Sequence, residues 1–435
     1  MNKQRVELLL AAVLLLPCAG RAQNTVSLEQ LWALADEQVT SLKIERAAVE
    51  SAEHDVAVNA ACRLPDISTE LSVGYLGDGV LFNRDYTNSM HIDNPHFTNN
   101  FALRAQQTIY SGGAVSAGID IAKLNREMAK LNYATNREEV RFVIASHYLD
   151  LCRMQNRMKV VEKNIALTQD ILRNINSRYN NGTALKTDIM RYELQLEALQ
   201  LNQIKLLDAK KTISHTLATL LHLNADTLLT ADFGTVDGNR QLLYSEEQWQ
   251  QLALNNNRAK QSQLAVDLSE KQLKLQRSEL LPKVAAVAEM HLDGPITTEV
   301  PVLDKNIAYW FAGIGVSYNL SALYKSNRKV SKAKSQLVMN REAKNLTLET
   351  IKNAVHSTYI DYLTAYKELD TQRKSVELAN ANYLVVEKRY TNGLALLTDM
   401  LDASNTKLAA ETGEADAEIN IAYYQLKLKY LSHTL

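Results

Sequence analysis

Apolar residues recur at alternating steps of four and three along two long stretches of the chain. One series covers residues 140–179 and the other covers 351–390. A repeat that averages 3.5 residues is typical of helices that pack along a coiled-coil seam. Both series lie in segments without proline, 96–281 and 302–435. We therefore expect very long helices rather than a string of short ones.

The second series follows the first by 211 residues at every position, which indicates an internal duplication. Its clearest part pairs RYNNGTALKTDIM at 178–190 with RYTNGLALLTDML at 389–401, identical at eight of thirteen positions. Each half also contains a Leu-Pro pair, at 64–65 and at 281–282. This period is far longer than the roughly 20–50 residues of solenoid repeats. We interpret the chain as two homologous halves.

Both halves predict the same order of elements: a helix, two strands, a long helix, a tight turn and a returning helix. The predicted helices cover residues 27–62, 115–178, 184–220, 246–281, 324–388 and 395–433. At about 1.5 Å per residue, each long helix would span roughly 96 Å. The two shorter helices of each half would then stack end to end beside the long one.

Four short segments show a different pattern, in which apolar and polar residues alternate. They cover residues 67–76, 101–109, 284–292 and 308–320. In the first, Ile67 and Leu71 share one face and Glu70 lies on the other. A strand of about ten residues with one apolar face has the length needed to cross a bilayer in a barrel. The connecting segments 77–97 and 293–306 are rich in Gly, Asp, Asn and Pro, which predicts exposed loops.

Four strands are too few to close a barrel, which needs about eight, and lipid does not tolerate open strand edges. We therefore expect several copies of the chain to pool their strands, and three copies would supply about twelve. Glu70, Arg104, Glu289 and His291 would face the lumen of such a barrel. The predicted fold class is an α+β membrane protein. It would combine long antiparallel coiled-coil hairpins with four strands per subunit that enter a shared β-barrel.

The first 22 residues have the pattern of a secretory signal peptide. Lys3 and Arg5 precede an apolar run at 8–16 that is too short to span a bilayer, and a small-x-small cleavage site follows at 20–22. Cys18 leaves lipidation open as an alternative. The predicted divisions are the signal peptide at 1–22, a first structural repeat at 23–222, a connector at 223–243 and a second repeat at 244–435.

Charge and motifs exclude several classes of function. The chain carries 48 basic and 49 acidic residues without a basic stripe, so we expect no nucleic-acid partner. It has no nucleophile elbow, phosphate-binding loop, HExxH or paired-cysteine motif, so we predict neither an enzyme nor a cofactor. His91 and His96 lie in an Asn-rich loop without the spacing of a metal site. We interpret them as exposed loop histidines and expect no metal.

Taken together, these features resemble the TolC-like outer-membrane efflux proteins, or outer-membrane factors. The resemblance covers nearly all of the mature chain. It rests on the duplicated halves, the Leu-Pro entry to each strand pair, and the repeated Arg-Tyr-x-x-Gly turn followed by Thr-Asp. One junction departs from the pattern, since the first long helix opens after Ser-Gly-Gly at 111–113 and the second after Leu-Ser-Ala-Leu at 320–323.

The resemblance implies a homotrimer in the outer membrane of a Gram-negative bacterium, in contact with lipid, with a helical extension into the periplasm. The hairpins of the three subunits would form a trimeric α-barrel, and their strands would form a shared 12-strand outer-membrane β-barrel. It also implies an equatorial place for the connector. Such a protein is a passive exit duct of a tripartite efflux or type I secretion system. Its partners are a periplasmic adaptor (membrane fusion protein) and, indirectly, an inner-membrane transporter. An alternative stays open: a secreted periplasmic coiled-coil adaptor or structural spacer without a membrane barrel.

By the same resemblance, the two helical turns form a periplasmic tip that contacts the adaptor. The expected contact residues are Asn181, Gly182, Thr183, Asn392, Gly393 and Leu394. The expected gate or constriction residues are Tyr179, Asp188, Tyr390, Asp399 and Asp402.

Two readings of the acidic residues remain open from the sequence. Asp188 and Asp399 would each also serve as a first-turn acid favoured by the helix dipole. Asp399 and Asp402 lie one helical turn apart, and we expect them to line the tunnel mouth and bind cations. We expect Tyr390 to hydrogen-bond Asp188 of a neighbouring helix pair. An arginine that locks the tip in some family members is absent from 395–396, which predicts a differently built lock.

Overall fold

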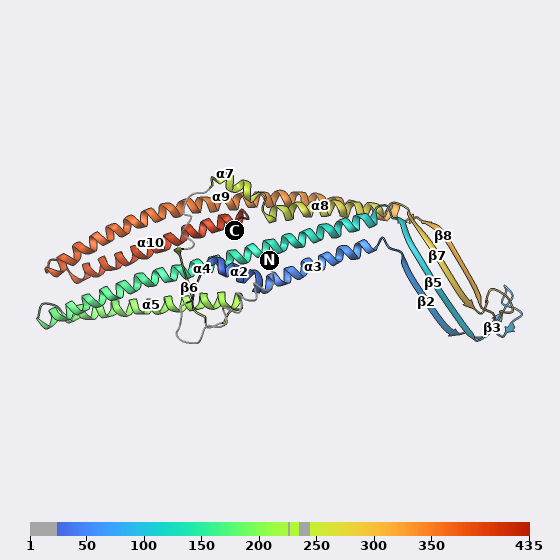
Figure 1. Cartoon of the computed structure of the whole chain (residues 1–435), viewed down its shortest axis with the longest axis horizontal. Coiled ribbons are helices and arrows are strands. Elements are labelled where there is room, and N and C mark those ends of the chain that lie inside the picture. The colour runs from blue at the N-terminus through green and yellow to red at the C-terminus, as the bar shows by residue number, and fades with distance from the viewer. Residues whose placement is uncertain (1–23, 225–226, 235–243) are drawn as a thin grey trace, which may run out of the picture. The chain divides into compact units, whose positions relative to one another are not determined.

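The structure is a computed structural model that describes residues 24–224, 227–234 and 244–435 (Figure 1). The predicted signal peptide and most of the predicted connector lie outside these residues. The chain divides into two compact units that are each assembled from separate segments. Unit 1 consists of Met1–Lys43, Asn136–Ala253 and Lys352–Leu435, and unit 2 consists of Ile44–Thr135 and Leu254–Ile351. Each unit takes residues from both predicted halves.

Two long helical hairpins dominate unit 1. They are α4 (Ala114–Asn180) with α5 (Lys186–Leu220), and α9 (Ala322–Thr391) with α10 (Leu397–Leu431), where α4 and α9 begin in unit 2. Unit 1 also contains α2 (Leu28–Gln38), α7 (Glu246–Ala253) and a parallel pair of short strands, β1 (Asn24–Val26) and β6 (Leu229–Ala231). The four predicted hairpin helices are therefore confirmed, while the β1–β6 pair was not predicted.

The predicted coiled-coil seam is the core of these hairpins. Buried seam residues are Val140, Ile144, Leu151, Val161, Ile175, Val355, Tyr362, Leu369, Ala379 and Tyr383. An isolated helix is only marginally stable in water. Burial of an apolar stripe of this kind therefore supplies most of the stability of a long helix. Polar contacts also fix how the helices align along one another. Arg157 on α4, for example, donates from Nε to Asp416 Oδ1 on α10 over 2.8 Å. Within the described residues, no helix has the length and apolar character needed to cross a membrane.

The first helix of each half differs from the prediction, because each is broken into two. Residues 27–62 form α2 and α3 (Thr40–Ala61), separated by Val39 in an extended conformation (φ −62°, ψ 123°). Residues 246–281 form α7 and α8 (Asn257–Ser278). Asn256 caps α8 by accepting a hydrogen bond from the Ala259 amide over 2.9 Å. Asparagine side chains favour helix ends for this reason.

A four-stranded antiparallel sheet distinguishes unit 2. Its order is β2 (Asp66–Tyr75), β5 (Phe97–Tyr110), β7 (Lys283–Gly294) and β8 (Ile307–Ser317). All four predicted strands are confirmed, with ends shifted by a few residues. β5 and β7 join the strand pairs of the two halves, with Leu103 opposite Met290. A further hairpin, β3 (Gly79–Leu81) with β4 (Met90–Ile92), lies within a segment predicted only as loop.

The two faces of the sheet have opposite character. On one face, large apolar side chains are 66–77% exposed: Ile67, Leu71, Val73, Trp310, Ile314 and Val316. On the other, Arg104 lies 3.6 Å from Glu70 and 3.8 Å from Glu289 between charged atoms. His291 Nε2 lies 3.1 Å from Glu289 Oε2. The predicted alternation is confirmed, and the four charged residues assigned to one face do lie together.

One charged cluster in unit 1 supports a test of stability. Asp36 on α2 accepts hydrogen bonds from Arg137 Nε (2.7 Å) and from Arg141 Nη2 (2.7 Å) on α4. The bond from Arg137 is the main reason why the pKa of Asp36 lies below its ordinary value. A carboxylate with a lowered pKa stabilises the fold above its unfolded pKa of about 3.9, and this contribution disappears as the pH falls through the lowered value.

We expect Asp36→Asn to lower the free energy of unfolding by about 1.5–3 kcal/mol at neutral pH, because charge-assisted hydrogen bonds to two arginines are lost. Thermal unfolding followed by circular dichroism measures this. Glu37→Gln, a substitution at the exposed neighbouring residue, is the control and should leave the midpoint unchanged. The difference between Asp36→Asn and the original protein should shrink below pH about 4. An equal midpoint at neutral pH would contradict this role of Asp36.

Candidate functional site

The two hairpin turns have the same backbone geometry. Gly182 has φ +75° and Gly393 has φ +71°. In the first turn, the amides of Gly182 and Thr183 donate to the carbonyl oxygens of Tyr179 (2.9 Å) and Arg178 (2.8 Å). The second turn contains the same two hydrogen bonds at the corresponding residues of the second half. This is the pattern of a Schellman motif, in which glycine takes the left-handed position without strain.

Both predicted contact surfaces lie on these turns. Asn181–Thr183 and Asn392–Leu394 are exposed, and Leu394 is 69% exposed although it is apolar. An exposed leucine in a tight turn adds nothing to the stability of the hairpin by burial. The turns therefore present a combination of polar and apolar side chains to whatever lies beyond them.

The structure assigns a local role to two of the predicted gate acids. Asp188 Oδ2 accepts a hydrogen bond from the Leu185 amide (3.2 Å), and Asp399 Oδ2 accepts one from the Leu396 amide (3.0 Å). Each bond satisfies an amide at the start of the returning helix, where a negative charge is also favoured by the helix dipole. The first-turn reading of these residues is thus confirmed. A second role in a constriction stays a prediction.

Tyr390 lies where the two hairpins meet, and its partner is a residue that the sequence did not single out. The Arg178 guanidinium lies 5.1 Å from the centre of the Tyr390 ring, and Arg178 Nη1 donates to the Tyr390 carbonyl oxygen over 3.3 Å. This contact connects the end of α4 to the end of α9. Arg178 opens the repeated Arg-Tyr-x-x-Gly motif, which was the available signal. The sequence could not show that Arg178 would make this contact while its counterpart Arg389 is exposed.

Electrostatic effects on Tyr390 come from both hairpins. Burial raises the pKa of Tyr390, Arg178 lowers it, and Asp188 raises it again. Asp188 and Tyr390 are thus close enough to interact within one chain. The predicted hydrogen bond from Tyr390 to Asp188 of a neighbouring helix pair stays a prediction. Tyr179, Asp399 and Asp402 are exposed.

A small apolar core supports the turns. It contains Ile175, Tyr192, Tyr383, Leu397, Met400 and Ala403, so all four hairpin helices contribute. Tyr192 is buried, and its hydroxyl has no hydrogen-bond partner among the residues that the structure describes. Burial raises the pKa of Tyr192. Gln195 Nε2 also donates to Asn405 Oδ1 over 2.8 Å, which links α5 to α10.

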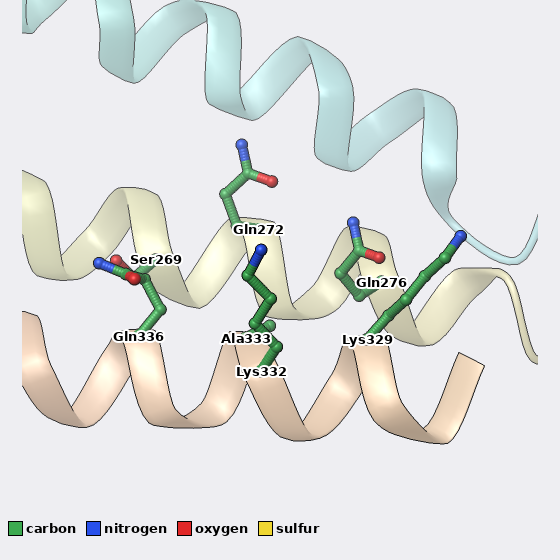
Figure 2. Close-up of a pocket in the computed structure, with 7 residues that line it drawn as sticks. All are labelled: Ser269, Gln272, Gln276, Lys329, Lys332, Ala333 and Gln336. Atoms are coloured by element: carbon green, nitrogen blue, oxygen red, sulfur yellow. The ribbon is translucent and has the colours of Figure 1, made fainter. Parts of the chain in front are cut away.

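A groove in unit 2 lacks the side chains expected of a catalytic site. It lies between α8 and α9, has a volume of about 330 Å³, and is lined by Ser269, Gln272, Gln276, Lys329, Lys332, Ala333 and Gln336 (Figure 2). Lys329 Nζ is 2.8 Å from Glu279 Oε2. The lining contains amides, ammonium groups and one hydroxyl, without an imidazole, thiol or carboxylate. Ser269 Oγ donates to the Ala265 carbonyl oxygen over 2.9 Å rather than to a lysine, so the lining pairs no nucleophile with a base.

Comparisons with known proteins agree with this architecture. The model of the outer membrane efflux protein family matches residues 32–222 and 249–431, one segment in each half. The outer membrane efflux protein BepC of Brucella suis biovar 1 (strain 1330) is 22% identical over 427 residues, which cover 97% of this chain and 89% of that protein. The outer membrane protein TolC of Salmonella enteritidis is 20% identical over 334 residues, covering 73% of this chain. The alignment spans 66% of TolC, just under two thirds of its length.

Solved structures show the same fold at low sequence identity. The outer membrane protein VceC from Vibrio cholerae has a TM-score of 0.78 at 15% identity, over 93% of this chain and 95% of that chain. The CmeC outer membrane channel of Campylobacter jejuni has a TM-score of 0.77 at 14% identity, over 94% and 85%. The likeness in fold extends over both units. Because the family model covers most of both halves, the chain belongs to the outer membrane efflux protein family and is an outer-membrane protein.

Proposed function

We propose that this chain is one subunit of a homotrimeric channel, the passive exit duct of a tripartite efflux or type I secretion system. The observation that carries the proposal is the exposed apolar face of the β2–β5–β7–β8 sheet. Six large side chains on that face are each 66–77% exposed. Such a patch on a protein in water marks a membrane or protein contact. Lipid would cover it at a gain of roughly 1.5–3 kcal/mol per side chain.

The edges of the sheet support the homotrimer. Among the described residues, β2 pairs only with β5 and β8 pairs only with β7, so each has one unpaired edge. Backbone groups at such an edge are not tolerated in lipid, and closure removes them. Four strands from each of three copies give about twelve, which is within the range of closed outer-membrane barrels. The face with Arg104, Glu289 and His291 would then line a wet lumen.

The helical hairpins would carry the duct into the periplasm. α4 contains 67 residues, which at 1.5 Å per residue is roughly 100 Å of helix. The turns at 181–183 and 392–394 would meet a periplasmic adaptor, and an inner-membrane transporter beyond it would supply the energy. The channel itself would have no catalytic activity and no cofactor.

The proposed constriction lies next to the turns. Asp399 and Asp402 would face the tunnel and attract cations, with Asp188, Tyr179 and Tyr390 beside them. Asp399 accepts the Leu396 amide with one carboxylate oxygen, Oδ2. The other oxygen is available to a cation, so capping of α10 and a role in the constriction are compatible. The Arg178–Tyr390 contact would be the lock between the hairpins of one subunit.

The first prediction from the proposed duct concerns assembly and location. We expect the mature protein to fractionate with the outer membrane, to need detergent, and to have the mass of three chains, because the apolar face and strand edges require both lipid and partner copies. Light scattering coupled to size-exclusion chromatography measures the mass of the protein without its detergent. A detergent-free monomer or dimer in the periplasmic fraction would refute the duct and favour a coiled-coil adaptor or spacer.

A second prediction concerns ion selectivity in planar bilayers. The double variant Asp399→Asn/Asp402→Asn should lose cation selectivity, while its trimer stays intact because an asparagine amide oxygen still accepts the Leu396 amide. The reversal potential in a potassium chloride gradient measures selectivity. Asp55→Asn is the control, because Asp55 is an exposed residue on α3, and this variant should retain the original selectivity. Unchanged selectivity in the double variant would place the constriction elsewhere.

The adaptor contact supports a third prediction, measured in cells. Leu394→Glu should abolish efflux of a fluorescent dye in a strain that lacks its own copy of the gene, because a charge enters the proposed apolar contact. The amount of trimer and its conductance should not change. Tyr86→Glu, at another exposed apolar residue between β3 and β4, is the control and should restore efflux. Normal efflux by Leu394→Glu at equal expression would argue against this contact.

A further inference from the structure

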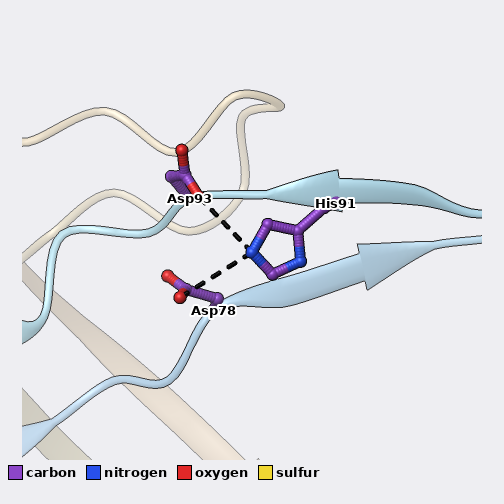
Figure 3. Close-up of side chains that lie close together, drawn as sticks. All are labelled: Asp78, His91 and Asp93. Carbon is purple, nitrogen blue, oxygen red and sulfur yellow. Dashed lines mark ion pairs between the residues drawn. The ribbon is translucent and has the colours of Figure 1, made fainter.

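The segment between β2 and β5 folds into a hairpin that gathers three potential metal ligands (Figure 3). β3 and β4 are antiparallel, so Asp78 precedes one strand and Asp93 follows the other. His91 Nε2 lies 3.4 Å from Asp93 Oδ1 and 3.8 Å from Asp78 Oδ2. One ligand atom of each residue lies within 4.8 Å of the other two. Figure 3 shows the imidazole facing both carboxylates.

The surrounding loop fixes one of the carboxylates. The backbone amide of Asn94 donates to Asp78 Oδ1 over 3.1 Å, which leaves Oδ2 as the Asp78 oxygen nearest to His91. Asn94 Nδ2 donates to the Gly77 carbonyl oxygen over 2.8 Å. His96 Nδ1 hydrogen-bonds the Leu76 carbonyl oxygen over 3.0 Å, so His96 holds the base of the hairpin closed. Support of this kind orients metal ligands in known sites.

A second observation in the same loop points to an absent donor. The side-chain oxygen Oδ1 of Asn94 is buried and has no hydrogen-bond partner in the described part of the chain. A buried acceptor without a partner is unfavourable. A small movement of the loop on ion binding would let a water molecule held at the neighbouring Asp78 reach this oxygen and supply the missing donor.

The chemistry of the three donors selects a class of ion. One imidazole and two carboxylates suit zinc and similar divalent transition metals, which bind nitrogen and oxygen at roughly 2.0–2.2 Å. Ligand atoms around such an ion are roughly 3.3 Å apart. The two separations from His91 Nε2, 3.4 and 3.8 Å, are close to this value, and the two carboxylates lie within 4.8 Å of each other. The side chains of His91 and Asp93 are 63% and 94% exposed, so they are able to rotate towards an ion. A cation also relieves the repulsion between two neighbouring carboxylates.

We propose that Asp78, His91 and Asp93 form a binding site for a divalent transition-metal ion of the zinc class. The ion ties the residue before β3 to residues on and after β4, so it staples the hairpin between two sheet strands. The remaining coordination positions are taken by water. This site replaces the expectation that His91 is a plain loop histidine. It does not depend on the proposed duct.

Zinc titration of the full mature chain in detergent tests the site. The protein carries no polyhistidine tag and is first stripped with EDTA, and isothermal titration calorimetry with zinc chloride gives stoichiometry and affinity. We expect one zinc ion per chain. His91→Ala should weaken binding by about ten-fold or more.

Two further variants keep the test decisive. His54→Ala removes an exposed histidine on α3 and should retain the original affinity and stoichiometry. Asp93→Asn keeps the size of the side chain, so it should weaken zinc binding even if His91→Ala disturbs the hairpin. The proposal is overturned if the original chain binds no stoichiometric zinc, if both site variants bind it with unchanged affinity, or if His54→Ala is the variant that loses it.

Discussion

A single chain leaves its four-stranded sheet incomplete, and this constraint governs how the rest of the molecule is organised. The outer edges of β2 and β8 carry backbone groups without a partner strand among the described residues, and one face exposes six large apolar side chains. No other strand among the described residues pairs with these edges, since the strands outside the sheet form two separate pairs, β1–β6 and β3–β4. The proposed trimer in lipid would supply what is missing, because copies of the sheet would pair its edges and lipid would cover its apolar face.

The two halves share one backbone architecture but differ in the side chains around their turns. Both turns share the same Schellman geometry and the same capping acid, so the duplication preserved what the backbone requires. The side chains around the turns have diverged. Arg178 packs on Tyr390, whereas its counterpart Arg389 is exposed. Asp402 corresponds to Arg191 in the first half. A ring built from three such chains would therefore alternate two kinds of hairpin.

The sequence predicted the elements that depend on local periodicity. The coiled-coil seam and the alternation of the strands are repeated over many residues, and each placed its element to within a few residues. It missed features that depend on contacts distant in sequence. Val39 interrupts the first predicted helix without a Gly or Pro, next to the weak helix formers Thr40 and Ser41, and β1 pairs with β6 across about 200 residues.

Of the candidate site, the sequence predicted the turns, their glycines and the acids that follow them, because these repeat in both halves. It did not identify the Arg178–Tyr390 contact, which requires the two hairpins to be adjacent. Nor did it group His91 with Asp78 and Asp93, because the short β3–β4 ladder has three residues on each strand and lies in a segment dominated by turn formers. Such a hairpin gives too few alternating positions for periodicity to detect.

The distribution of charge indicates where the proposed duct would discriminate between ions. On the polar face of the sheet, Arg104 lies between Glu70 and Glu289, and His291 lies beside Glu289 and Asp293, so each of these carboxylates has a basic side chain within ion-pair distance. Asp399 and Asp402 have no ion pair among the described residues, and both are exposed. Like charges one helical turn apart repel each other unless cations gather nearby. Selectivity for cations would therefore arise mainly at the turns, where these two carboxylates have no basic partner among the described residues.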